Sequence, residues 1–184
     1  MGFFCRENLE VQVYKHPHYQ SLNEQLMKDI STLDFTWHED NIYGTNIKGS
    51  QFNFCNNLDA KPRGVLLLER WVKQIVLSQI RGNIPVTIKY ATWVARLDKG
   101  QQTIRHFHHP HCSIVFVYFV NTPKGSSPLV FPTSGKKVKA EAGTLVIHPG
   151  VMQHEVPPNK CDGRITIASN LYISEAEINL STVH

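Results

Sequence analysis

The sequence lacks the features that mark membrane proteins and disulfide-rich proteins. Its longest apolar run, CSIVFVYFV at residues 112–120, is far shorter than the roughly 18 residues that cross a bilayer. The four cysteines are scattered and include no Cys-x-x-Cys pair, which argues against a disulfide framework and against a thiolate zinc site. A reducing cytoplasm is therefore the expected setting, with no membrane partner.

A large excess of charge of either sign is also lacking. Charged residues make up 18% of the chain, and the formal net charge is +4. The one dense basic cluster, GKKVK at residues 135–139, is better explained as a solvated loop or strand end than as a nucleic-acid contact. The N-terminus MGFFCRENLE lacks the hydrophobic region of a signal peptide. Nucleic acid is not indicated as a partner.

The chain divides by pattern into a helical first part and a strand-rich second part. Its 184 residues, 41% of them hydrophobic, suit a single domain spanning residues 1–184, and we find no internal repeat or linker. We expect helical and irregular N-terminal support over residues 1–84. A strand-built core follows over residues 85–173, with a C-terminal tail over residues 174–184.

Two helices are predicted in the N-terminal support. Residues 19–33 carry apolar side chains at helical spacing, and Ser21 with Glu24 forms a capping-box pattern at their start. Residues 64–81 form the second helix, for which Gly82 supplies a stop signal.

After Pro85 the pattern changes to short β segments separated by turn signals. Runs rich in β-branched and aromatic residues predict strands at residues 86–97, 112–120, 128–131, 144–148 and 164–173. No helix alternates with these strands, which argues against a parallel α/β fold. We therefore predict a mainly β fold with flanking helices, an antiparallel sandwich or jelly roll.

Four of the ten histidines lie within residues 106–111, directly before the most apolar strand. Strand side chains alternate between faces, so His106 and His108 of the sequence HFH would point the same way and could clamp a metal. A third ligand would come from His148 or His154. Three imidazoles leave coordination positions open, as in catalytic metal sites, and suit iron, zinc, copper, nickel or manganese.

Other interpretations of this stretch stay open. His109 and His111 in the neighbouring HPH share the His-x-His spacing, although Pro110 disfavours regular strand geometry between them. A histidine cluster can be a solvated loop, and a strand histidine can be a satisfied core residue. From this stretch alone, a metal site and the absence of one are equally supported.

The second half of the chain resembles the iron(II)- and 2-oxoglutarate-dependent oxygenases. The resemblance is carried by Trp93, Gly100, HFH at 106–108, an apolar strand, and GTLVIHPGVMQHEVPPNKCDGRITIASN at 143–170. The pattern is most similar to an oxygenase family of bacteria and tailed phages, with a His-x-His pair, a distal His and a later Arg. The stretch NIKGSQF at 46–52 also resembles that family.

The resemblance implies a double-stranded β-helix, the cupin-like form of the jelly roll, and assigns roles to its residues. His106, His108 and His154 would hold iron(II), with 2-oxoglutarate and dioxygen taking the remaining positions. Arg164 would pair with the far carboxylate of 2-oxoglutarate through its planar guanidinium. Tyr118 would add a hydroxyl hydrogen bond to that cosubstrate, although a core position is commoner for such a tyrosine.

The implied activity is hydroxylation of an unidentified substrate, with succinate and carbon dioxide as co-products. A small molecule or a peptidyl residue is the expected partner, in the cytoplasm of a bacterium or of a phage-infected cell. Two copies could pair through their helices. The chain departs from the family at His148, which stands where Phe is usual. With His109 and His111, it could surround the metal ligands or form a different ligand set.

Two other functions fit the same pattern. A cupin-like metal enzyme would use three or four histidines without 2-oxoglutarate and would not need a buried Arg164. A non-catalytic binding or structural module, such as a phage particle component, would keep the fold without the chemistry.

The stretch over residues 36–62 is rich in Asn, Gly and aromatic residues and is expected to be irregular. Its aromatic side chains either cover the mouth of the site or pack the helices on the sheet; they are Trp37, Tyr43, Phe52 and Phe54.

Overall fold

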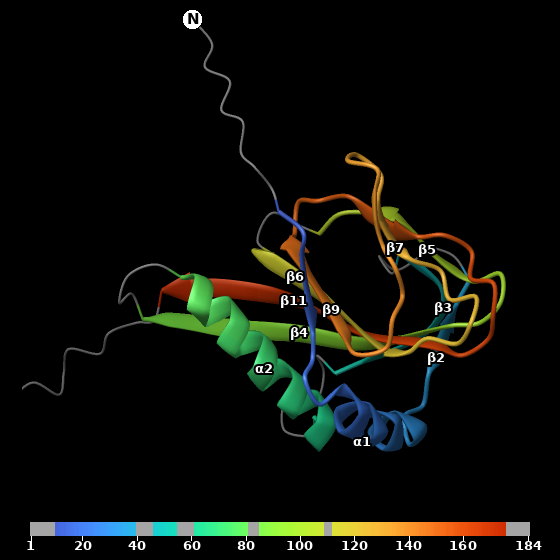
Figure 1. Cartoon of the computed structure of the whole chain (residues 1–184), viewed down its shortest axis with the longest axis horizontal. Coiled ribbons are helices and arrows are strands. Elements are labelled where there is room, and N and C mark those ends of the chain that lie inside the picture. The colour runs from blue at the N-terminus through green and yellow to red at the C-terminus, as the bar shows by residue number, and fades with distance from the viewer. Residues whose placement is uncertain (1–9, 40–45, 55–60, 81–84, 109–111, 176–184) are drawn as a thin grey trace, which may run out of the picture.

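The computed structural model describes residues 10–39, 46–54, 61–80, 85–108 and 112–175. Its helices are α1 (Tyr19–Ser31) and α2 (Arg63–Gln79) (Figure 1). Its strands are β1 (Gln12–Lys15), β2 (Thr36–His38), β3 (Ile47–Asn53), β4 (Val86–Leu97), β5 (Gln102–His106), β6 (Ile114–Asn121), β7 (Leu129–Phe131), β8 (Lys136–Val138), β9 (Thr144–Pro149), β10 (His154–Val156) and β11 (Arg164–Glu175). Neither helix is long and apolar enough to span a membrane.

The strands form one curled antiparallel sheet in the order β1-β9-β6-β11-β4-β3-β5-β10-β7-β8, with β2 paired to β3. The long strands β4 and β11 pair from Leu97 opposite Arg164 to Val86 opposite Glu175. We call β1, β9, β6, β11, β4 and β3 the large layer, and β5, β10, β7 and β8 the small layer. The two layers enclose a common core, so the predicted mainly β jelly roll is confirmed.

Alternate residues of the large-layer strands serve two different cores. On β6, Tyr118 belongs to the core beneath the helices, whereas its neighbour Phe119 belongs to the core between the layers. On β11, Ile167 faces the helices and Ala168 faces the small layer. This period of two follows from the alternation of side chains along a strand. Each strand of the large layer therefore has a helix face and an inner face.

The two helices pack together and cover the helix face of the large layer (Figure 1). Leu26 of α1 and Leu68 of α2 are fully buried there. The predicted capping box is wrong, because α1 begins at Tyr19 and the hydroxyl of Ser21 donates to the carbonyl of His18. The predicted stop signal, Gly82, lies outside the described residues.

The stretch predicted to be irregular contains β2 and β3, and β1 is a further strand that the sequence did not reveal. β3 has a mostly polar sequence, IKGSQFN, which does not predict a strand. It pairs with both β4 and β5 and so joins the two layers. Gly49 permits this approach, because a Cβ there would lie 2.7 Å from a methyl group of Leu97.

Two of the four aromatic residues of this stretch take the packing role among the two that were predicted. Phe54 is buried in the core beneath the helices and Phe52 packs against the same core, which is the packing role. Trp37 is exposed. Tyr43 lies outside the described residues.

Candidate metal centre

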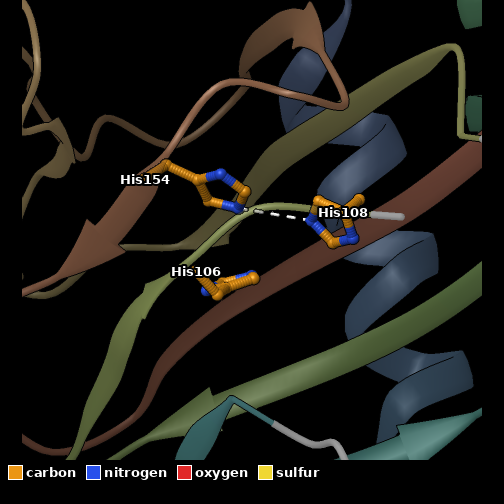
Figure 2. A group of neighbouring side chains, drawn as sticks. All are labelled: His106, His108 and His154. Atoms are coloured by element: carbon orange, nitrogen blue, oxygen red, sulfur yellow. Dashed lines mark hydrogen bonds between the residues drawn. The ribbon is translucent and has the colours of Figure 1, made fainter. Parts of the chain in front are cut away.

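Strand pairing in the small layer brings three histidines together. His106 ends β5, His154 opens β10, and the two residues are paired in register. His108 lies two residues beyond β5, where its backbone N–H donates to the carbonyl of Gly150 at 2.9 Å. The ligand nitrogens of the three rings lie within 4.8 Å of one another (Figure 2). The structure thus groups the three residues that the sequence nominated as metal ligands.

Backbone carbonyls orient two of these rings. Nδ1 of His106 lies 2.8 Å from the carbonyl oxygen of Ile104, and Nδ1 of His154 lies 3.0 Å from that of Met152. A carbonyl oxygen can only accept a hydrogen bond, so Nδ1 carries the proton and Nε2 keeps its lone pair. Metal-ligating histidines are held in this way.

The Nε2 atoms of His108 and His154 lie 3.4 Å apart. Each can therefore reach one shared metal ion at the usual metal–nitrogen distance of about 2.1 Å. The group consists of nitrogen donors that suit a divalent transition metal, and it leaves coordination positions for other ligands.

Burial keeps these imidazoles neutral. Desolvation lowers the pKa of His106, lowers that of His108 to about 3 and lowers that of His154 to about 2. The neighbouring imidazoles lower the pKa of His108 and His154 further, because two positive charges repel each other at close range. Metal binding requires the neutral form of histidine, so no proton has to leave at neutral pH.

Arg164, at the start of β11, is a buried cation without an anionic partner. Its side chain is 1% exposed and packs over the ring of Phe119, with 5.3 Å between the guanidinium carbon and the ring centroid. Nε donates to the carbonyl of Ser127 at 3.2 Å, whereas Nη2 has no hydrogen-bond partner. No carboxylate in the described ranges forms an ion pair with it. Burial lowers the pKa of Arg164 to about 10, so it stays charged at neutral pH.

Arg164 and the three histidines line one cavity of about 280 Å³ between the layers. The other described lining residues are uncharged, and they are Asn46, Ile47, Gln51, Asn53, Trp93, Ala95, Thr103, Val115, Val117, Leu129, Val156, Thr166, Ala168 and Asn170. One fully buried positive charge therefore faces a cavity whose described wall contains no carboxylate and no lysine.

Tyr118 does not join this group, so its predicted contact with a cosubstrate is not supported. Its side chain lies on the helix face of β6, and its hydroxyl donates to Oδ1 of Asn23 on α1 at 2.8 Å. The cavity wall is formed instead by its neighbour Val117, on the inner face.

His148, which the sequence also offered as a third ligand, lies beside the centre as well. It is buried on β9, and its ring centroid lies 4.5 Å from that of His154. Burial lowers the pKa of His148 to about 4. The neighbouring HPH stretch, with His109 and His111, lies outside the described residues.

The polar residues Gln51, Asn53 and Asn170 of the cavity wall were given no role from the sequence. Asn170 could have been placed there, because positions 164, 166, 168 and 170 of one strand share a face. Gln51 and Asn53 could not, since β3 itself was not predicted.

No family model matches the sequence, and no curated protein matches it in sequence. Solved structures nevertheless share its fold. A viral collagen prolyl hydroxylase from Paramecium bursaria Chlorella virus-1, in complex with 2OG, superposes with a TM-score of 0.68 at 13% identity, over 88% of this chain and 94% of that one.

Two further structures superpose similarly. A prolyl hydroxylase from Trichoplax adhaerens, bound to a hypoxia inducible factor peptide fragment, gives a TM-score of 0.69 at 15% identity, over 88% and 83% of the two chains. An oxidoreductase of the 2OG-Fe(II) oxygenase family from Burkholderia pseudomallei gives a TM-score of 0.64 at 12% identity, over 87% of this chain and 84% of that one. At these identities the similarity establishes the fold, which is the one that the sequence resemblance implied.

Proposed function

We propose that this protein is an iron(II)- and 2-oxoglutarate-dependent dioxygenase that hydroxylates a substrate. The observation that carries the proposal is Arg164, a buried guanidinium with an unpartnered Nη2, in the same cavity as three neutral imidazoles. A buried charge without a partner is costly, so its retention favours an anionic ligand. A dicarboxylate extending from the histidines to Arg164 would satisfy both ends of the cavity.

The residues fit the cofactors that this activity needs. His106, His108 and His154 would hold iron(II) as neutral imidazoles, and Nε2 of His106 and of His154 is already unprotonated. Bound iron(II), with 2-oxoglutarate and dioxygen, supplies the oxidising power that hydroxylates a C–H bond, with succinate and carbon dioxide as co-products. Arg164 would anchor the far carboxylate of 2-oxoglutarate, and its packing against Phe119 and Ser127 keeps the guanidinium in place.

The absence of a carboxylate from the three-histidine group has an energetic consequence. Neutral imidazoles do not offset the charge of a divalent ion, so the metal should bind more weakly than at a site with a carboxylate ligand. The negative charge of 2-oxoglutarate would supply part of that compensation. Metal and cosubstrate should therefore strengthen each other's binding, and by linkage the two enhancements are equal.

The substrate is proposed to occupy the part of the cavity lined by Gln51, Asn53, Trp93 and Asn170. Trp93 lies beside the metal ligands, with 6.1 Å between its ring centroid and that of His108. The amide side chains are uncharged and can both donate and accept hydrogen bonds. Peptidyl proline is the first class to screen, because two of the superposing structures are prolyl hydroxylases named for collagen or bound to a peptide.

An anaerobic titration with iron(II) and then 2-oxoglutarate tests the proposal. Cosubstrate bound directly to iron should produce a weak charge-transfer band in the visible range. Arg164→Met should lose the band at cosubstrate concentrations that saturate the wild type, while retaining the metal. The matched control is Arg96→Met, which removes an exposed arginine from the neighbouring strand β4 and should leave the band intact.

One other function is favoured by a specific observation. The fourth buried imidazole, His148, is compatible with a cupin-like metal enzyme that does not use 2-oxoglutarate. Metal bound stoichiometrically with no band at any cosubstrate concentration would reject the oxygenase proposal and support the cupin-like enzyme.

A further inference from the structure

Three buried side-chain atoms in the described part of the chain have no hydrogen-bond partner, and all belong to the inner face of the large layer. They are Nη2 of Arg164, Oδ1 of Asn170 and Nε2 of His148. The proposed function accounts for two of them, since Arg164 faces the cosubstrate and Asn170 faces the substrate. It leaves His148 unexplained.

The ring of His148 is placed relative to His154 much as a ring of the three-histidine group is. The centroids of His148 and His154 are 4.5 Å apart with 60° between the ring planes. Those of His106 and His154 are 4.3 Å apart with 57° between the planes. His148 is therefore a fourth imidazole in direct contact with the centre, carried by the opposite layer.

The protonation of His148 also matches that of His106 and His154. Its Nδ1 lies 2.9 Å from the carbonyl oxygen of Pro149, so Nδ1 carries the proton and Nε2 is a bare lone pair. Among the described residues, the other ring packed against it is that of Phe131, which offers no conventional hydrogen-bond donor. A buried acceptor without a partner is destabilising, and a phenyl ring would fill the same space without that cost. The lone pair therefore points to a Lewis acid as its partner.

We propose that His148 is a fourth histidine ligand of the metal centre, binding through Nε2 when 2-oxoglutarate is absent and yielding its position when the cosubstrate chelates. His148 lies outside the group of nitrogens within 4.8 Å, so its side chain must rotate toward the other three rings to bind. The inference rests on the metal centre of the proposed function, but not on cosubstrate binding or on turnover.

The test uses the full chain loaded with copper(II), whose electron paramagnetic resonance spectrum reports the number of coordinating nitrogens. Wild-type protein should show four coordinating nitrogens without 2-oxoglutarate and fewer with it. This measurement needs no variant, so it decides the question even if a substitution at His148 impairs folding. A count of four coordinating nitrogens that falls when 2-oxoglutarate is added supports the inference. A count of three under both conditions overturns it.

The variant His148→Phe sharpens the test, because it keeps an aromatic ring against His154 and removes only the nitrogen ligand. Without 2-oxoglutarate, its cobalt(II) affinity should fall roughly tenfold or more, and with saturating 2-oxoglutarate the difference should shrink. A purely packing role would leave both affinities unchanged. The control is His16→Phe, which replaces an imidazole packed on Trp71, at 4.6 Å between centroids, on the helix side of the molecule.

The two proposals fail in different ways. Four nitrogens on copper(II), with no charge-transfer band on iron(II), would reject the oxygenase and leave the fourth ligand established. If the wild type shows the charge-transfer band and His148→Phe binds cobalt(II) as tightly as the wild type does, the fourth ligand is rejected and the oxygenase proposal stands.

Discussion

The helix face and the inner face of the large layer are built by the same strands, yet their buried polar groups differ in whether they have hydrogen-bond partners. On the helix face, the buried carboxylate of Glu69 forms an ion pair with Lys61 at 2.7 Å and accepts a hydrogen bond from Thr92 at 2.5 Å. The hydroxyl of Thr92 also lies 3.0 Å from that of Ser169. Polar groups on this face are thus held by partners within the chain.

The inner face carries the three buried polar atoms that have no partner in the described part of the chain, on His148, Arg164 and Asn170. Buried polar groups in folded proteins are nearly always hydrogen-bonded, so each exception calls for an explanation. Here the exceptions surround one cavity and one group of histidines, which marks the inner face as the ligand-binding side. The difference teaches that unsatisfied groups locate a site more sharply than burial alone, because both faces are buried.

The largest effect is expected from removing a metal ligand on the inner face. With saturating 2-oxoglutarate, which displaces His148 in our proposal, His154→Ala should abolish stable metal binding, because only two imidazoles of the group remain. Metal content after anaerobic loading and gel filtration measures this, with circular dichroism as the check on folding. Metal retained by the double variant His106→Ala, His154→Ala would move the ligand set to other histidines.

The second effect separates ligand binding from stability on the same face. Arg164→Met should weaken 2-oxoglutarate binding by about 2–5 kcal/mol, the usual cost of truncating one partner of a buried charge pair. The unliganded protein should unfold at the same or a higher urea concentration, because an unpaired buried charge is removed. Calorimetric titration and urea unfolding provide the two readouts. A large loss of stability with unchanged cosubstrate affinity would make Arg164 a structural residue.

A substitution on the helix face should lower stability and leave ligand affinity unchanged, the reverse of the result expected for Arg164→Met. Leu26→Ala opens a cavity in the fully buried core beneath the helices and should cost about 3 kcal/mol of unfolding free energy. Metal and cosubstrate affinities, measured well below the unfolding transition, should not change. If they did change, packing on the helix face would be coupled to ligand binding on the inner face.

The smallest effect tests the position of Tyr118. Tyr118→Phe removes the hydrogen bond to Asn23 and should cost about 1 kcal/mol of unfolding free energy. Its affinity for 2-oxoglutarate should match that of the wild type. A clear drop in that affinity would show that Tyr118 reaches the cosubstrate after all.

Tyr118 also shows where sequence reasoning stops. Its strand reads IVFVYFVN and is apolar at nearly every position, because both of its faces are buried. A period of two then carries no information about which residues face which core. On β11, by contrast, RITIASN alternates, so Arg164 and Asn170 could be placed on one face from the sequence.

The missed strand β3 has a related cause. Its residues between Ile47 and Phe52 are polar or glycine, so neither a hydrophobic run nor a clear alternation marks it. It is a strand because β4 and β5 pair with it on either side. Pairing partners far along the chain decided this element, and local propensity did not.

The sequence by itself determined the two helices, the five apolar strands, the adjacent pair His106 and His108, and the shared face of Arg164 and Asn170. All of these depend on periodicities within one segment, which local sequence encodes directly. Only the tertiary structure decided that β10 pairs with β5 and sets His154 against His106, and that His148 meets them from the opposite layer. Those contacts depend on which strands pair and how the sheet curls, and these are properties of the whole fold.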